Sequence, residues 1–157
     1  MDQQKISAAI DQHMATVRAV AFTFTSSVLV YLVLAWLLTV QMGIGSFMEV
    51  PKAVIAVVVA AGLVIIFAGY AISRSILGQP AGPNPEAGAL MQRYIKAVII
   101  ACALREVAAA TGFALSLFSG DLTWVLVLAG TAMFSMTVHW PRRSSVEDWM
   151  QQQERRS

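Results

Sequence analysis

Charged residues and cysteines are both scarce in this sequence. Of 157 residues, 13 % are charged, about half of the roughly 25 % in an ordinary soluble domain. The single cysteine, Cys102, excludes an intramolecular disulfide and a cysteine-based metal site. The sequence also lacks a Gly-rich phosphate loop, a nucleophile elbow and a pair of intramembrane histidines, so it gives no support to an enzyme, a metal site or a cofactor. Hydrophobic residues make up 57 % of the chain and mean hydropathy is +0.66, which is typical of an integral membrane protein.

Four apolar stretches are each long enough to cross a bilayer. At about 1.5 Å per residue, roughly 20 helical residues match a hydrocarbon core of about 30 Å. A helix also satisfies every backbone polar group internally, as lipid demands. The sequence therefore predicts an all-α fold, a bundle of four transmembrane helices over residues 19–41, 53–73, 97–118 and 122–140.

Cations are distributed unevenly around these stretches. Nine lie before the first stretch, between the second and third, or after the fourth, whereas only Lys52 lies in the other two connections. By the positive-inside rule, both termini and the central connection are expected in the cytoplasm. We accordingly expect a multi-pass protein of the plasma (inner) membrane, with the lipid bilayer as a partner. The cations flank the apolar runs and form no aromatic-interleaved patch, so they do not indicate nucleic-acid binding.

Three further segments are expected on the cytoplasmic side. In residues 1–18, apolar side chains at three- and four-residue spacing predict a short helix in the membrane interface, although an extension of the first span fits equally well. Residues 74–96 form a connection whose centre is rich in proline and glycine and cannot continue a helix. In the tail, residues 141–157, Pro141 ends the fourth span, and a capping-box spacing after it predicts a short helix.

The adjacent residues Arg105 and Glu106, near the middle of the third span, are the most informative feature. Ionisable groups at this depth cost about 2.5–3.5 kcal/mol each on insertion scales and usually face protein or water. Neighbouring residues of a helix point about 100° apart, so each side chain is expected to need a partner from elsewhere. The two residues either bind an ion or proton, or tie helices together, and the sequence leaves both readings open.

Small residues surround this pair and recur in the second span. They allow two helices to approach backbone to backbone. The positions expected at helix interfaces are Gly62, Gly69, Cys102, Ala103, Ala109, Ala110 and Gly112.

The third span reads ALREVAAATGFALSL, in which Glu106 is followed by small residues and then by Gly112. The preceding span ends in Arg74, and Gln79 and a proline follow it. Over roughly residues 51–119 the chain therefore resembles the proteolipids of rotary ATPases, the c subunit of F-type and the K subunit of V-type enzymes. The resemblance implies an oligomer in which Glu106 binds an ion or proton.

Two features differ from that family. Arg105 directly precedes the carboxylate, where a positive charge opposes reversible ion loading, and the first and fourth spans are additional to the proteolipid hairpin. The sequence therefore favours a non-enzymatic scaffold or accessory subunit, with Arg105 and Glu106 specifying helix packing. The alternative is a proteolipid-like ion- or proton-binding subunit that uses Glu106. In both cases we expect a homo-oligomer or a larger membrane complex.

Overall fold

The computed structural model describes residues 3–44, 49–82 and 86–155, and every regular element in these ranges is helical. The all-α prediction is therefore confirmed for this part of the chain. The elements, in chain order, are α1 (Gln3–Trp36), its π-helical continuation η1 (Leu37–Gln41), α2 (Lys52–Gly78), α3 (Ala87–Ser119), α4 (Thr123–Val138) and α5 (Arg143–Glu154).

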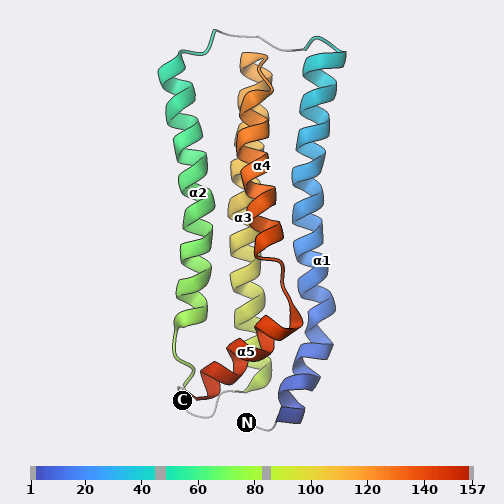
Figure 1. Cartoon of the computed structure of the whole chain (residues 1–157), viewed down its shortest axis with the longest axis vertical. Helices are drawn as coiled ribbons and strands as arrows, with labels where there is room; N and C mark the ends of the chain where they lie inside the picture. The colour runs from blue at the N-terminus through green and yellow to red at the C-terminus, as the bar shows by residue number, and fades with distance from the viewer. Residues whose placement is uncertain (1–2, 45–48, 83–85, 156–157) are drawn as a thin grey trace.

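The first four helices run along the long axis of the molecule, and α5 lies across one end (Figure 1). Helix α3 is central, because it packs against α1, α2 and α4, whereas the backbones of α1 and α2 do not approach one another closely. Helix α1 begins and α2 ends on the side where α5 lies, which we call the α5 end.

Three helices are long and apolar enough to cross a membrane: α1 together with η1, α2, and α3. Helix α4 passes this test only together with α5, and the two are bent by 67°. Its 16 residues extend about 24 Å, less than a typical hydrocarbon core of about 30 Å. These apolar helices are those of a membrane protein with three or four candidate spans.

These helices are apolar on their outer surfaces as well as on the faces that pack against other helices. Such a distribution suits lipid as the surrounding solvent, because a helix that is hydrophobic on all sides has no face suited to water. The most exposed large apolar side chains of α1, α2 and α4 are Phe22, Val57, Val64, Phe67, Leu126 and Phe134.

Two predicted segments have different boundaries in the structure. The described part of residues 1–18 is not a separate helix but the beginning of α1, so the extension reading is the one observed. Helices α2 and α3 both continue into residues 74–96, and the connection between them shortens to residues 79–86. The physical reason is that the helix-breaking prolines and glycines lie in the middle of this segment, while its polar flanks are compatible with helix.

The connection between α3 and α4 is tight and specifically bonded. Gly120 ends α3 with φ 71°, a conformation that favours glycine, and its N–H donates to Ser116 O over 2.9 Å. The Val125 N–H donates to Ser116 Oγ, and the Thr123 N–H donates to Asp121 Oδ1, both over 2.9 Å. Two free amides at the start of α4 are thereby satisfied, which fixes α4 against α3.

Helix α5 is attached to both α1 and α2. Arg143 pairs with Asp11 of α1 over 2.8 Å. Trp149 Nε1 and Gln153 Nε2 both donate to Leu77 O in the last turn of α2, over 2.9 and 2.8 Å. A carbonyl that the end of α2 would otherwise leave unpaired is therefore bonded by another helix.

Candidate functional site

Glu106 lies where α3 contacts α1. Its Oε1 is 2.5 Å from Ser27 Oγ and 3.5 Å from the Tyr31 hydroxyl. Ser27 and Tyr31 are four residues apart and so share one face of α1. The Ser27 contact is short and the Tyr31 contact lies at the outer limit of a hydrogen bond. Ser27 is therefore the main partner of the Glu106 carboxyl.

The hydrogens at Ser27 limit how this contact can be made. Ser27 Oγ also lies 3.0 Å from Phe24 O in the preceding turn of α1. A hydroxyl carries one hydrogen, and the Phe24 carbonyl can only accept. Both bonds form together if a protonated Glu106 donates to Ser27, whereas an ionised Glu106 competes with Phe24 for that one hydrogen.

Small residues let α1 approach α3 around Glu106. Cys102 and Ala109 are buried, and they belong to one apolar cluster that includes Val28 of α1. Ala103 and Ala110 are partly buried on either side of the carboxylate. The short side chains allow the α1 backbone to come close enough for Ser27 to reach Glu106.

The three glycines expected at interfaces all face another helix. A Cβ at Gly112 would lie 2.9 Å from Leu128 Cβ of α4, and one at Gly62 would lie 2.8 Å from Leu128 Cδ2. A Cβ at Gly69 would lie 3.3 Å from Ala101 O of α3. Leu128 therefore fits between α2 and α3 because neither Gly62 nor Gly112 carries a side chain.

Arg105 has a different environment from Glu106. It is only 3 % exposed, and its Nε has no hydrogen-bond partner. Its polar contact is with the Cys102 side chain, one turn away on α3. No carboxylate in the described part of the chain forms an ion pair with it. The two charges that are adjacent in sequence are therefore directed to separate sites.

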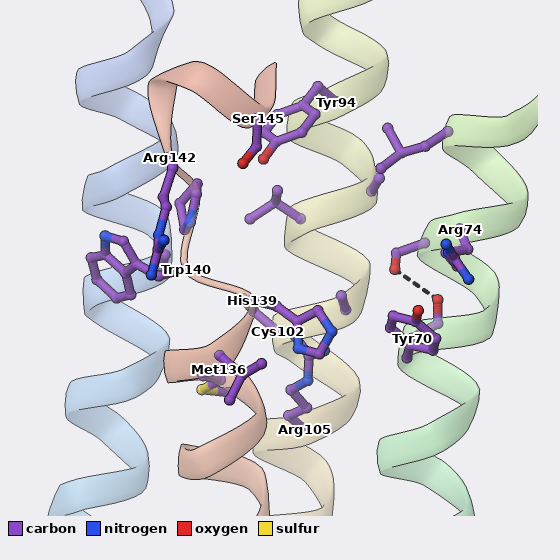
Figure 2. Close-up of a pocket in the computed structure, with 18 of the residues that line it drawn as sticks. Tyr70, Arg74, Tyr94, Cys102, Arg105, Met136, His139, Trp140, Arg142 and Ser145 are labelled. Carbon is purple, nitrogen blue, oxygen red and sulfur yellow. Dashed lines mark hydrogen bonds between the residues drawn. The ribbon is translucent and has the colours of Figure 1, made fainter. Parts of the chain in front are cut away.

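Arg105 lines a cavity of about 460 Å³ at the α5 end (Figure 2). Its basic groups also include Arg74 of α2 and two residues of the α4–α5 connection, His139 and Arg142. None of the described residues lining it is acidic. Polar side chains complete the wall: Thr25, Tyr70, Ser73, Tyr94, Trp140 and Ser145.

The cavity lies beyond the early end of α4. That helix stops at Val138, while its neighbours continue further toward the α5 end (Figure 1). Pro141 follows, and the chain then turns by 67° into α5. Because proline supplies no N–H for a further helical bond, α4 cannot continue through it. Instead of further turns of α4, the connecting segment, residues 139–142, forms part of the cavity wall.

The positions of two of these basic groups are set by contacts with Tyr70. The Arg74 guanidinium lies 5.4 Å from the Tyr70 ring centroid, and the His139 ring lies 5.1 Å from it, in a tilted arrangement. His139 Nδ1 also donates to Ser135 O over 2.9 Å, which leaves Nε2 for another partner. Figure 2 shows Arg74 and Tyr70 together on the α2 side of the cavity.

Sequence reasoning did not find this cavity. Arg74 and Arg142 were interpretable as flanking charges, and His139 as an interfacial residue, because each lies at the end of an apolar stretch. The one available signal was local: the fourth stretch ends in His139 and Trp140, and Pro141 and Arg142 follow at once. Nothing in the sequence indicated that Arg105, 34 residues before His139, would line the same space.

A metal site finds no support in the geometry. The described residues include no group of three or more His, Cys, Asp or Glu side chains that could hold a metal ion. Comparisons with family models, curated proteins and solved structures find no significant match to this chain. The resemblance to rotary ATPase proteolipids therefore stays a prediction from the sequence.

Proposed function

We propose that this chain is a non-enzymatic membrane protein with four spans, both termini in the cytoplasm, acting as a scaffold or accessory subunit. Glu106 specifies how its first and third spans pack. The contact that carries this proposal is the 2.5 Å hydrogen bond between Ser27 and Glu106. A carboxyl already bonded within the same chain needs no ion to satisfy it, which supports a packing role.

The bond has a modest expected energy. Interhelical hydrogen bonds in membrane proteins contribute about 0.6 kcal/mol on average and up to about 1.7 kcal/mol. Leaving a polar group unsatisfied in lipid costs more, because no water replaces the lost partner. Glu106 therefore selects one register of α1 against α3 mainly by making other registers unfavourable.

Short connections and apolar outer surfaces support an accessory role within a larger assembly. The α3–α4 connection, for example, consists only of residues 120–122. The exposed apolar faces of α1 and α2 can contact lipid, a second copy or another membrane subunit. In this proposal, helix surfaces rather than a separate domain provide the contacts with partners.

A second candidate is a proteolipid-like proton-binding subunit that uses Glu106. The single hydrogen of Ser27 favours this second candidate. A protonated Glu106 can donate to Ser27 while Ser27 donates to Phe24 O, so that both bonds form together. Such a subunit must also release that proton to water or to a partner. Arg105 would not provide this path, since it belongs to the separate cavity.

A double-mutant cycle separates these candidates. Thermal unfolding is measured in mild detergent for Ser27→Ala, Glu106→Ala and the double variant, with Ser26→Ala as the matched control. The packing role predicts a coupling of about 0.6–1.7 kcal/mol between Ser27 and Glu106. It predicts none between Ser26 and Glu106.

Carbodiimide labelling provides the complementary readout. A packing carboxyl is expected to stay unlabelled at every pH at which the protein is folded. Additive Ser27 and Glu106 effects together with pH-dependent labelling of Glu106 would reject the packing role in favour of proton binding.

A further inference from the structure

The Arg105 guanidinium is a buried cation that lacks a counter-ion. It is 97 % buried, its Nε is unpartnered, and the described carboxylates do not pair with it. Buried charges in proteins are normally paired, and ionisable groups inside membranes mark ligand or ion paths. Because the thiol of Cys102 cannot neutralise a guanidinium, the charge balance at this position is incomplete.

The other basic groups of the cavity increase this imbalance. Arg74, Arg105 and Arg142 bring three guanidinium groups to one cavity, with the His139 imidazole as a fourth basic group. No acidic residue of the described chain lines the same space. Arg74, His139 and Arg142 are exposed to solvent, whereas Arg105 is buried, so an anion in the cavity would mainly compensate the charge of Arg105 and would attract the others as well. The complementary ligand is therefore negatively charged.

The form of these donors indicates which anion fits. A guanidinium presents a planar fork of N–H donors that matches the oxygens of a phosphate, and several such forks can share one group. Hydroxyl groups of Tyr94 and Ser145 lie in the same wall and can donate to the remaining oxygens. A flat carboxylate has only two oxygens and would leave more of these donors unused.

We propose that this cavity binds a phosphate ester, with Arg105 as its deepest contact and Arg142 and Arg74 nearer its rim. A volume of about 460 Å³ lies within the usual range for small-ligand pockets, roughly 300–1,000 Å³. It accommodates a phosphate with a small head group, but not the acyl chains of a phospholipid as well. Basic pockets between membrane helices bind lipid head groups in this way, and a soluble phosphate ester has the same chemistry.

This site is separate from the contact proposed for packing. Helix α1 contributes Ala21 and Thr25 to the cavity wall, but neither Ser27 nor Glu106 lines the cavity. Loss of phosphate binding would therefore leave the Ser27–Glu106 coupling unchanged, and loss of that coupling would leave phosphate binding unchanged.

The test is a binding titration of the delipidated full chain in a non-ionic detergent. The fluorescence of Trp140, which lines the cavity, reports occupancy, and Trp140→Phe shows how much of the signal comes from the cavity. The probes are short-chain phosphatidylglycerol, phosphatidylcholine with the same chains, glycerol 3-phosphate and inorganic phosphate. Binding of phosphatidylglycerol without binding of the soluble probes identifies a lipid head group. Comparable binding of glycerol 3-phosphate identifies a soluble ester.

Matched variants locate the binding. Arg142→Gln removes an exposed cation of the cavity and is expected to weaken binding about fivefold. Arg105→Gln is expected to weaken it at least tenfold, because this contact is buried. Lys96→Gln removes an exposed cation of α3 outside the cavity and should leave affinity unchanged.

Thermal unfolding provides a second readout in case Arg105→Gln changes the fold. Arg105→Gln is expected to raise the melting temperature of the ligand-free protein, because it removes an unneutralised buried charge. It should abolish the further rise that the bound probe gives the wild type. Absence of binding to all four probes would overturn the proposal. Equal loss of affinity in Lys96→Gln and Arg142→Gln would also overturn it, since binding would then reflect surface charge alone.

Discussion

Gly112 is the position where the closeness of α3 and α4 can be tested most directly. A Cβ built there would lie 2.9 Å from Trp124 O and 2.9 Å from Leu128 Cβ. The carbonyl belongs to the α4 backbone, so rotation of a side chain cannot relieve that contact. The short connection bonded at Ser116 also prevents α4 from simply moving away from α3.

The magnitude follows from two opposing effects of Gly112→Ala. Overpacking a close contact costs about 1–3 kcal/mol. Replacing glycine by alanine inside a helix gains up to about 1 kcal/mol. We therefore expect a net loss of about 1 kcal/mol. Gly130→Ala in α4 is the matched control, because a Cβ there has no atom within 4 Å. Gly130→Ala keeps only the gain in helix propensity, so the free energies of unfolding of the two variants should differ by about 2 kcal/mol.

Gly62→Ala gives an intermediate case. Its nearest atoms are the Cδ atoms of Leu128, at 2.8 and 3.0 Å, and the end of a leucine side chain can rotate away. The expected order of stability is Gly130→Ala, Gly62→Ala and then Gly112→Ala. The assay is reversible unfolding in mixed micelles followed by circular dichroism. If Gly112→Ala proved as stable as Gly130→Ala, the close packing of α3 on α4 would be refuted.

Two further predictions concern pH and topology. Hydrogen bonds from the Thr123 hydroxyl and amide lower the pKa of Asp121 below its ordinary value, so its contribution to stability is present above about pH 4 and lost as pH falls through the lowered pKa. The melting temperature of Asp121→Asn should therefore fall less steeply between pH 5 and pH 3 than that of the wild type, and parallel curves would contradict this role. For topology, an impermeant thiol reagent added to intact cells should label Glu49→Cys but not Gln152→Cys, both made in a Cys102→Ser background. The reverse pattern would invert the proposed orientation.

Much of the fold could be predicted because the membrane makes simple demands on the sequence. Long apolar runs predicted α2 and α3, although not how far each helix continues beyond its apolar run. The spacing in residues 1–18 could not distinguish a separate helix from the start of α1, because both present the same face. In each case, the helix boundary that the sequence left open depends on residues outside the apolar runs.

The candidate sites were likewise predictable only in part. The small residues around Glu106 are local in sequence, so a close helix neighbour was predictable, but Ser27 as its partner was not. The cavity required more, because Arg74, Arg105 and Arg142 come from three separate segments. They line one cavity because α2 packs against α3 and the α4–α5 connection lies beside both, and that arrangement is a property of the tertiary packing.

The attachment of α5 has a mechanical consequence. The backbones of α1 and α2 do not approach one another closely, yet α5 is bonded to Asp11 in α1 and to Leu77 in α2. At the α5 end these contacts restrain their separation, and at the opposite end the covalent connection between η1 and α2 restrains it. A force in the membrane plane that pulls α1 and α2 apart at the α5 end would therefore be carried by α5, which contributes Ser145 to the wall of the cavity.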